Sequence, residues 1–173
     1  LAFFGTPEFA TPTLERLRSG PHRVAVVVSQ PDRRRGRGQR LSPSPVAELA
    51  LANEIPLLRP ENVNTAPFAE ELRGFEPDLG VVVAFGQFVS KRIRELPSLG
   101  YLINGHASLL PRFRGAAPIA HAILAGDTET GVSVMRLERE MDAGPVAEMR
   151  SIAIGPDETT GALTERLARL TAD

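Results

Sequence analysis

The chain has 173 residues, enough for one domain with a substantial hydrophobic core. Its formal net charge is −1, so no overall positive field would draw the whole domain onto nucleic acid, and any such contact must come from a local patch. It contains no cysteine, which excludes disulfides, thiolate nucleophiles and cysteine-ligated zinc.

The chain begins at Leu1, inside an apolar segment and without a methionine, and it ends at Asp173 directly after a helical pattern. We therefore expect truncation at both ends, with residues 1–173 forming one domain of a longer protein. No signal peptide is visible and no apolar run has the length of a membrane span, so we expect a cytoplasmic protein.

Short apolar runs alternate with helical patterns, which predicts an α/β fold with a mostly parallel sheet, a Rossmann-like three-layer sandwich. The predicted strands are 1–4, 24–28, 55–58, 80–85, 102–104, 132–137 and 146–154. The predicted helices are 9–17, 45–53 with Ser44 as N-cap, 68–72, 87–95, 118–124 and 159–168. We expect the last two strands to pair antiparallel.

One segment, residues 31–45, departs from this regularity because it is crowded with arginines and only Asp32 opposes them. So dense a block of like charge cannot pack in a core, and we expect a mobile surface loop. Composition alone favours neither nucleic-acid binding nor a solvated loop without a partner. The arginines are Arg33, Arg34, Arg35, Arg37 and Arg40.

Polar side chains gather where the predicted strand 102–104 ends. Asn104 and His106 lie at the carboxyl end of that strand, where ligands bind in open α/β sheets. An imidazole accepts and returns protons near neutral pH, and an amide donates to a developing oxyanion. Asp142, in a predicted turn beyond strand 132–137, could orient the imidazole and favour its charged form.

Each member of this trio, taken alone, is also an ordinary turn or cap residue. We interpret His22 and His121 as structural, and Ser108 lacks the Gly-x-Ser-x-Gly setting of a nucleophile. No Gly-x-Gly-x-x-Gly follows a predicted strand, so dinucleotide binding has little support.

Taken together, the motifs resemble a known family. The pattern Asn104-x-His106-x-Ser108-Leu109-Leu110-Pro111, followed by Gly115 and Asp142, is similar to the signature of the folate-dependent formyltransferases. Residues 3–9, 30–46 and 114–119 resemble the branch of that family whose acceptor is a methionyl-tRNA. The resemblance covers essentially the whole chain and implies the formyltransferase fold.

The resemblance implies transfer of a formyl group from 10-formyltetrahydrofolate to the α-amine of methionine on initiator tRNA, for translation initiation and without a metal. Asn104 would polarise the formyl oxygen and His106 would handle the amine proton. Asp142 would hold His106 or a water molecule and help protonate the departing folate nitrogen. Folate contacts are implied for the turn Ser108, Leu109, Leu110 and Pro111, and for a pterin-pocket wall of Phe85, Gly86, Gln87 and Phe88.

The arginine-rich segment resembles the family's insertion that contacts the tRNA acceptor end, which implies tRNA contacts for its five arginines. The family also has a C-terminal β-barrel domain that contacts tRNA, and we expect that domain to be absent from residues 1–173. The implied protein is a monomer of the bacterial cytoplasm, or of an organelle in a eukaryote.

Gly105 departs from the family pattern, which usually has Val there, and its backbone freedom predicts a looser geometry between Asn104 and His106. Two alternatives stay open. One is a related formyltransferase that acts on a sugar nucleotide or a ribonucleotide amine. The other is a folate- or tRNA-binding protein without catalysis.

Overall fold

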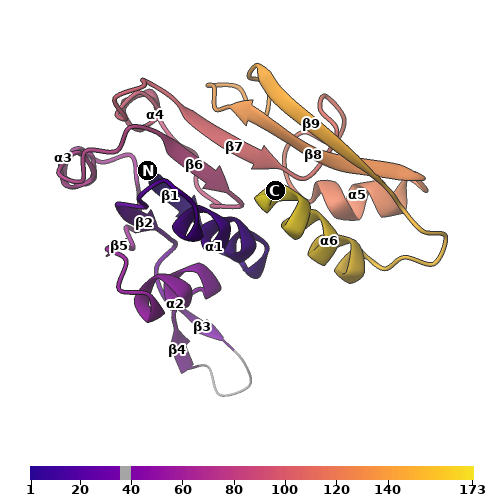
Figure 1. The fold of residues 1–173 in the computed structure, drawn as a ribbon, viewed down its shortest axis with the longest axis horizontal. Helices are drawn as coiled ribbons and strands as arrows, with labels where there is room; N and C mark the ends of the chain where they lie inside the picture. The colour runs from indigo at the N-terminus through magenta and orange to yellow at the C-terminus, as the bar shows by residue number, and fades with distance from the viewer. Residues whose placement is uncertain (36–39) are drawn as a thin grey trace.

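The computed structural model of the chain describes residues 1–35 and 40–173. Its core is one seven-stranded sheet with the order β5-β2-β1-β6-β7-β8-β9, beside a separate two-stranded ribbon of β3 and β4 (Figure 1). The strands of the large sheet are β1 (Ala2–Gly5), β2 (Val26–Val28), β5 (Leu57–Leu58), β6 (Gly80–Val83), β7 (Leu102–His106), β8 (Glu129–Arg136) and β9 (Val146–Ala153).

Strands β5, β2, β1, β6 and β7 run parallel, whereas β8 pairs antiparallel with both β7 and β9. The predictions of a mostly parallel sheet and of an antiparallel last pair are therefore confirmed. The helices are the 3-10 turn η1 (Glu8–Ala10), α1 (Thr11–Ser19), α2 (Pro45–Ala52), α3 (Ala66–Arg73), α4 (Lys91–Arg94), α5 (Pro118–Leu124) and α6 (Thr160–Ala172).

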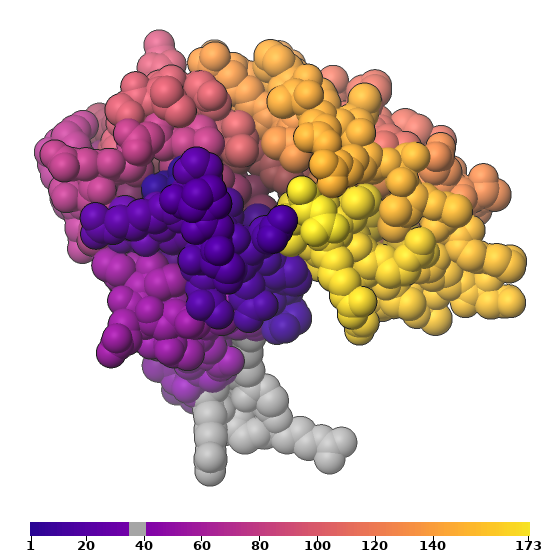
Figure 2. Space-filling model, in the orientation of Figure 1, coloured from indigo at the N-terminus to yellow at the C-terminus, as the bar shows by residue number. Residues whose placement is uncertain are grey.

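Helices cover both faces of the sheet because strand side chains alternate between the two faces. Phe3 and Val27 face a core with α1 and α2, whereas Phe4 and Val28 face a second core with α3 and α4. Helix α6 packs beside α1, so the beginning and the end of the chain lie together on one face (Figure 2). This arrangement is the predicted three-layer sandwich.

Side-chain caps fix where several helices begin. The Ser44 hydroxyl accepts a hydrogen bond from the backbone N–H of Ala47 at 3.1 Å, and Pro45 occupies the first helical position, as predicted. Thr65 and Thr159 cap α3 and α6 in the same way. None of the helices in the described part of the chain combines the length and apolarity that crossing a membrane requires.

The order of the strands creates a topological switch point. After β1 the chain adds β2 and β5 on one side, and it then returns to place β6 on the other side of β1. Ligands of open α/β sheets bind outside the carboxyl ends of the strands at such a point. Residues 6–7, which follow β1, and residues 84–86, which follow β6, meet there.

Two predicted elements differ from the structure. The helix predicted at 87–95 forms only as α4, because residues 87–90 are held by tertiary hydrogen bonds from the neighbouring segment 62–64. The strand predicted at 102–104 continues to His106, since it pairs with β6 on one side and β8 on the other. Asn104 and His106 are therefore strand residues and not residues of a following loop.

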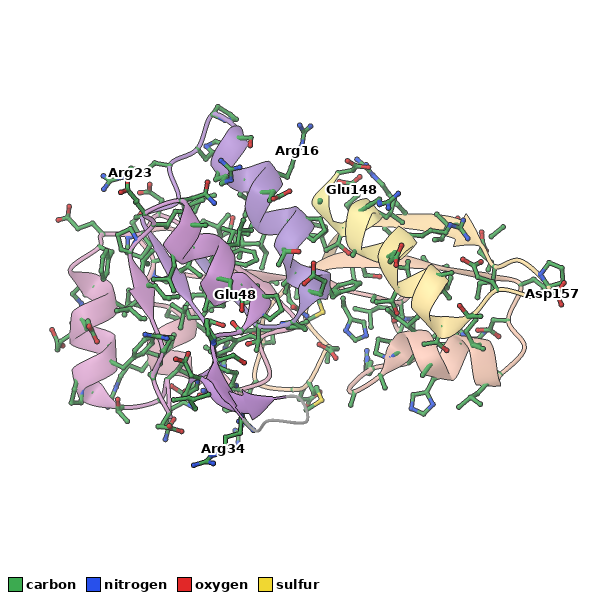
Figure 3. The ribbon with its side chains drawn as sticks, turned by 90° about the horizontal axis from the view of Figure 1, so that it is seen from below. Arg16, Arg23, Arg34, Glu48, Glu148 and Asp157 are labelled. Atoms are coloured by element: carbon green, nitrogen blue, oxygen red, sulfur yellow. The ribbon has the colours of Figure 1, made fainter. Side chains whose placement is uncertain are left out.

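The prediction of a loop over 31–45 is wrong for residues 33–35 and 40–42, which form an antiparallel ribbon of β3 (Arg33–Arg35) and β4 (Arg40–Ser42). Strand pairing satisfies the hydrogen-bonding groups of the backbone while the side chains of Arg33 and Arg34 stay exposed, so the charge density does not prevent regular structure. Arg34 extends away from the body of the protein (Figure 3). Arg37 lies outside the described residues.

Candidate active site

A cavity of about 800 Å³ opens at the carboxyl ends of β6 and β7. This volume lies within the range of small-molecule sites, which is roughly 300–1,000 Å³. Its walls come from four segments and from the beginning of α6. These segments are residues 84–89, 104–107, 115–120 and 137–142, and the single residues Phe9, Val82, Thr160 and Thr164 complete the wall.

Asn104 and His106 enter this cavity from the same face of β7, because they are two positions apart on a strand. They are 9% and 7% exposed, so each is nearly enclosed while still reaching the cavity. The Asn104 amide makes no side-chain hydrogen bond to any residue that the structure describes, so it is available to a ligand.

The His106 ring stands between two acceptors. Its Nε2 lies 2.9 Å from the carbonyl oxygen of Phe113, and its Nδ1 lies 3.4 Å from Oδ2 of Asp142. A carbonyl oxygen can only accept, so Nε2 must donate the hydrogen. Nδ1 is then the nitrogen that faces the carboxylate.

The Asp142 carboxylate is itself held in place. Its Oδ2 accepts a hydrogen bond of 2.8 Å from the backbone N–H of Gly115, and its side chain is 11% exposed. Asp142 adopts a positive φ of 49° in the loop between β8 and β9. Residues 104, 106 and 142, separated in sequence, thus meet at one wall of the cavity.

The predicted pterin-pocket wall also reaches the cavity, since Phe85, Gly86, Gln87 and Phe88 all line it. Phe85 is buried and packs edge-to-face on Phe4 with ring centroids 5.5 Å apart. Gln87 accepts from the backbone N–H of Val63 at 3.0 Å, which anchors the loop. Phe88 remains 60% exposed, leaving an apolar surface at the rim.

The predicted folate turn is placed differently, because residues 108–111 are not among those that line the cavity. The Ser108 hydroxyl is fully buried and donates to the carbonyl of Arg112 at 2.6 Å. Ser133 links the same turn to β8, since its hydroxyl donates to the Ser108 carbonyl and accepts from the Leu110 N–H. In this geometry Ser108, Leu109, Leu110 and Pro111 shape the turn that carries Phe113 and Gly115.

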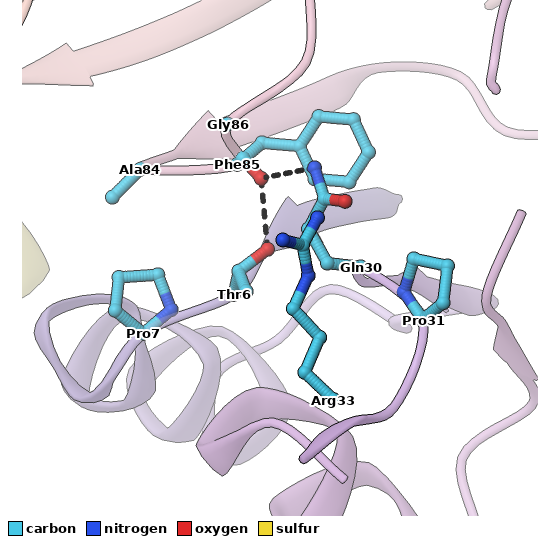
Figure 4. Close-up of a pocket in the computed structure, with 8 residues that line it drawn as sticks. All are labelled: Thr6, Pro7, Gln30, Pro31, Arg33, Ala84, Phe85 and Gly86. Carbon is cyan, nitrogen blue, oxygen red and sulfur yellow. Dashed lines mark hydrogen bonds between the residues drawn. The ribbon is translucent and has the colours of Figure 1, made fainter. Parts of the chain in front are cut away.

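A smaller pocket of about 270 Å³ adjoins the cavity at the topological switch point (Figure 4). Residues 84–86 line both the pocket and the large cavity and form the wall between them. The Phe85 carbonyl accepts from the Thr6 hydroxyl at 2.8 Å and from the Gln30 amide at 3.3 Å, and these bonds fix the wall. Arg33, at the base of the β3–β4 ribbon, also lines this pocket.

One arginine of the ribbon reaches that pocket. Arg33 lines it and Arg34 is exposed on the same strand, while Arg35 and Arg40 occupy paired backbone positions of β3 and β4. Asp32, the acidic residue of this segment, is paired with Arg59 at 2.6 Å. The carboxylate of Asp32 is thus paired with an arginine outside the ribbon.

Sequence reasoning did not find two groups that orient the catalytic candidates, the carbonyl of Phe113 and the N–H of Gly115. Both are backbone groups, and they have no side-chain signature. The positive φ values of Phe113 (53°) and Gly115 (87°) set the directions of these two backbone groups. For Gly115 the residue type was a signal, since glycine adopts such angles readily.

Comparisons with known proteins identify the family of the chain. A family model described as "Formyl transferase" matches residues 1–172. The chain is 49% identical over 173 residues to a methionyl-tRNA formyltransferase of Pelobacter propionicus and 51% identical over 171 residues to one of Myxococcus xanthus. These matches cover 100% and 98% of this chain but 54% of each relative, so the chain spans about half the length of these curated relatives.

Solved structures share the fold. A phosphoribosylglycinamide formyltransferase of Bacillus halodurans aligns with a TM-score of 0.80 at 22% identity, covering 99% of this chain and 88% of that one. A glycinamide ribonucleotide transformylase of Geobacillus kaustophilus aligns with a TM-score of 0.78 at 26% identity, covering 99% and 91%. From the family match and the fold, the chain belongs to the formyl transferase family.

Proposed function

We propose that the protein transfers a formyl group from 10-formyltetrahydrofolate to the α-amine of methionine on initiator tRNA. The observation that carries this proposal is the meeting of Asn104, His106 and Asp142 at one wall of an 800 Å³ cavity. The similarity to methionyl-tRNA formyltransferases over the length of this chain supports the choice of acceptor.

The chemistry follows from what each side chain can do. The amine nitrogen attacks the formyl carbon, and the carbonyl oxygen gains negative charge that the Asn104 amide can stabilise by donating a hydrogen bond. His106, with Nδ1 beside the Asp142 carboxylate, can exchange a proton with the reacting groups. The bond between the formyl carbon and the folate nitrogen then breaks, and that nitrogen takes up the proton that the amine gives up.

The larger cavity is the place we assign to the formyl donor, which is a substrate of the reaction. A pterin is flat, with hydrogen-bonding groups along its edge, and the cavity offers buried and exposed phenylalanine surface together with the backbone groups of residues 84–89 and 137–142. The residues we assign to contact it are Phe85, Gly86, Gln87 and Phe88. No residue cluster is needed to hold a metal in this chemistry.

The smaller pocket is the place we assign to the end of the acceptor, because it adjoins the cavity and carries Arg33. The arginine ribbon would then meet the phosphates of the acceptor stem. A small amine acceptor, as in glycinamide ribonucleotide transformylases, has no use for this ribbon. We also propose that the protein acts in the cytoplasm as a monomer.

The direct test uses the complete gene product with 10-formyltetrahydrofolate and methionyl initiator tRNA. We expect formylmethionyl-tRNA, and we expect His106→Ala or Asp142→Asn to lower turnover by about 100-fold or more with unchanged folding. The double substitution Arg33→Ala/Arg34→Ala should weaken tRNA binding and flatten its salt dependence, while leaving donor binding unchanged. Faster formylation of glycinamide ribonucleotide than of methionyl-tRNA would reject the acceptor assignment.

A further inference from the structure

The turn that follows β7 holds one residue in an unfavourable backbone conformation. Phe113 has a φ of +53°, a region that residues other than glycine rarely adopt and that persists only where the surroundings enforce it. Its carbonyl oxygen is the acceptor for Nε2 of His106 at 2.9 Å. The strained residue therefore controls the orientation of the imidazole at the candidate active site.

Surface side chains hold the ring of Phe113. The guanidinium carbon of Arg112 lies 4.8 Å from the centre of that ring, and Arg112 is itself paired with Asp127 at 2.9 Å. The His121 ring, on α5, stacks on Phe113 with an interplanar angle of 14° and centroids 6.2 Å apart. We call Arg112, Phe113 and His121 the Phe113 stack.

None of the three residues of the Phe113 stack is among those that line the large cavity. Arg112 and His121 are exposed, and Phe113 is half-buried. His121 therefore does not contact a substrate in that cavity, and its stacking contact with Phe113 links it to His106.

We propose that Phe113 and His121 are positioning residues, whose stacking holds the Phe113 carbonyl against His106 and so presents Nδ1 of His106 to Asp142. The carbonyl accepts the Nε2 hydrogen and thereby selects the tautomer, in the way that a second hydrogen bond commonly selects the reactive nitrogen of a histidine. Loss of the stack lets the Phe113 backbone leave its left-handed conformation, and the ring of His106 then loses its partner. The kinetic consequence rests on the proposed function, whereas the effect on the His106 ring does not.

The test compares His121→Ala, which removes the stacked ring, with His121→Phe, which keeps a flat ring in its place. Leu124→Ala is the matched control, because Leu124 lies on the same helix and is 82% exposed. Ring nitrogens of His106 are observed by ¹⁵N NMR in the complete gene product and assigned by their loss in His106→Ala. We expect His121→Ala alone to lose the protected Nε2–H signal and to show exchange between tautomers.

The same variants are assayed for formyl transfer. We expect His121→Ala to lower kcat by about tenfold with KM for the donor nearly unchanged, and His121→Phe to recover most of the loss, because misorientation of a catalytic group lowers the rate without weakening binding. An unchanged His106 spectrum in His121→Ala overturns the proposal, as does an equal change in Leu124→Ala. If the unsubstituted protein transfers no formyl group but the His106 spectrum still responds to His121→Ala, the proposed function fails and the positioning role stands.

Discussion

Gly105, between Asn104 and His106 on β7, lies under the last turn of α6. A Cβ added there would lie 2.7 Å from Cγ2 of Thr171, well inside van der Waals contact. Thr171 cannot rotate freely, since its hydroxyl donates to the Leu167 carbonyl at 2.7 Å. The glycine therefore permits close packing of helix on strand.

We predict that Gly105→Ala destabilises the protein by about 1 kcal/mol. Overpacking costs about 1–3 kcal/mol, whereas replacing a strand glycine by alanine recovers about 0.5–1 kcal/mol of conformational entropy. Thr171→Ser removes the obstructing methyl group and keeps the hydroxyl bond, so the double substitution should recover most of the loss. The double variant should be more stable, by about 1 kcal/mol, than the sum of the two single effects predicts.

The parent, the two single variants and the double variant form a double-mutant cycle. Urea unfolding of these four proteins gives the coupling energy from the shifts of the unfolding midpoints, provided that the slope is the same for all four. The reasoning is refuted if Gly105→Ala is as stable as the parent, or if its effect is the same with serine at position 171. The cycle also tests whether Gly105 loosens the site. Because β6 and β8 pair with β7 on both sides, we expect kcat of the double variant to stay within about twofold of the parent.

Three further predictions concern single hydrogen-bonded side chains elsewhere in the fold. Ser133→Ala should cost about 2 kcal/mol or more in urea unfolding, because two buried backbone groups lose their partner; a smaller loss argues against that bridge. Thr6→Val removes the hydrogen bond to the Phe85 carbonyl, which contributes about 1 kcal/mol. In steady-state assays KM for the donor should therefore rise about fivefold while kcat changes little. The backbone N–H of Gly155 and the Arg166 guanidinium hold the pKa of Glu158 below its ordinary value, so its stabilisation is present at neutral pH and lost as pH falls through that lowered pKa. Thermal melts of Glu158→Gln should thus show a deficit at neutral pH that vanishes in acid, and a deficit independent of pH would contradict this.

Much of the fold could be predicted from the sequence, because buried parallel strands and capped helices leave strong local patterns. The helix 118–124 and the N-cap at Ser44 are examples of such local signals. The segment 87–90 was mispredicted because its backbone conformation is set by hydrogen bonds to residues 62–64, a contact without a local signal. The ribbon at 33–42 was missed because charge density describes side chains and says little about backbone pairing.

The sequence indicated the side chains of the candidate site, but it did not indicate the backbone groups that hold those side chains. The side chains of His106 and Asp142 lie 3.4 Å apart and Asn104 lines the same cavity, whereas their catalytic roles stay predictions. The Phe113 carbonyl faces His106, and the Gly115 N–H donates to Asp142. Both groups depend on positive φ values, and only the glycine at position 115 gave a sign of this in the sequence. Residues 108–111 carry the motif most easily recognised, yet their hydrogen bonds serve the turn and not the cavity wall.

The central claim is that His106, oriented by Asp142, carries formyl transfer to methionyl-tRNA. The most direct measurement is single-turnover formylation of methionyl initiator tRNA by the complete gene product and by its Asp142→Asn variant, each saturated with 10-formyltetrahydrofolate. We predict that the variant binds both substrates with nearly unchanged affinity and forms formylmethionyl-tRNA at least about 100-fold more slowly. Equal single-turnover rates for the two proteins, or no product with either, would contradict the account.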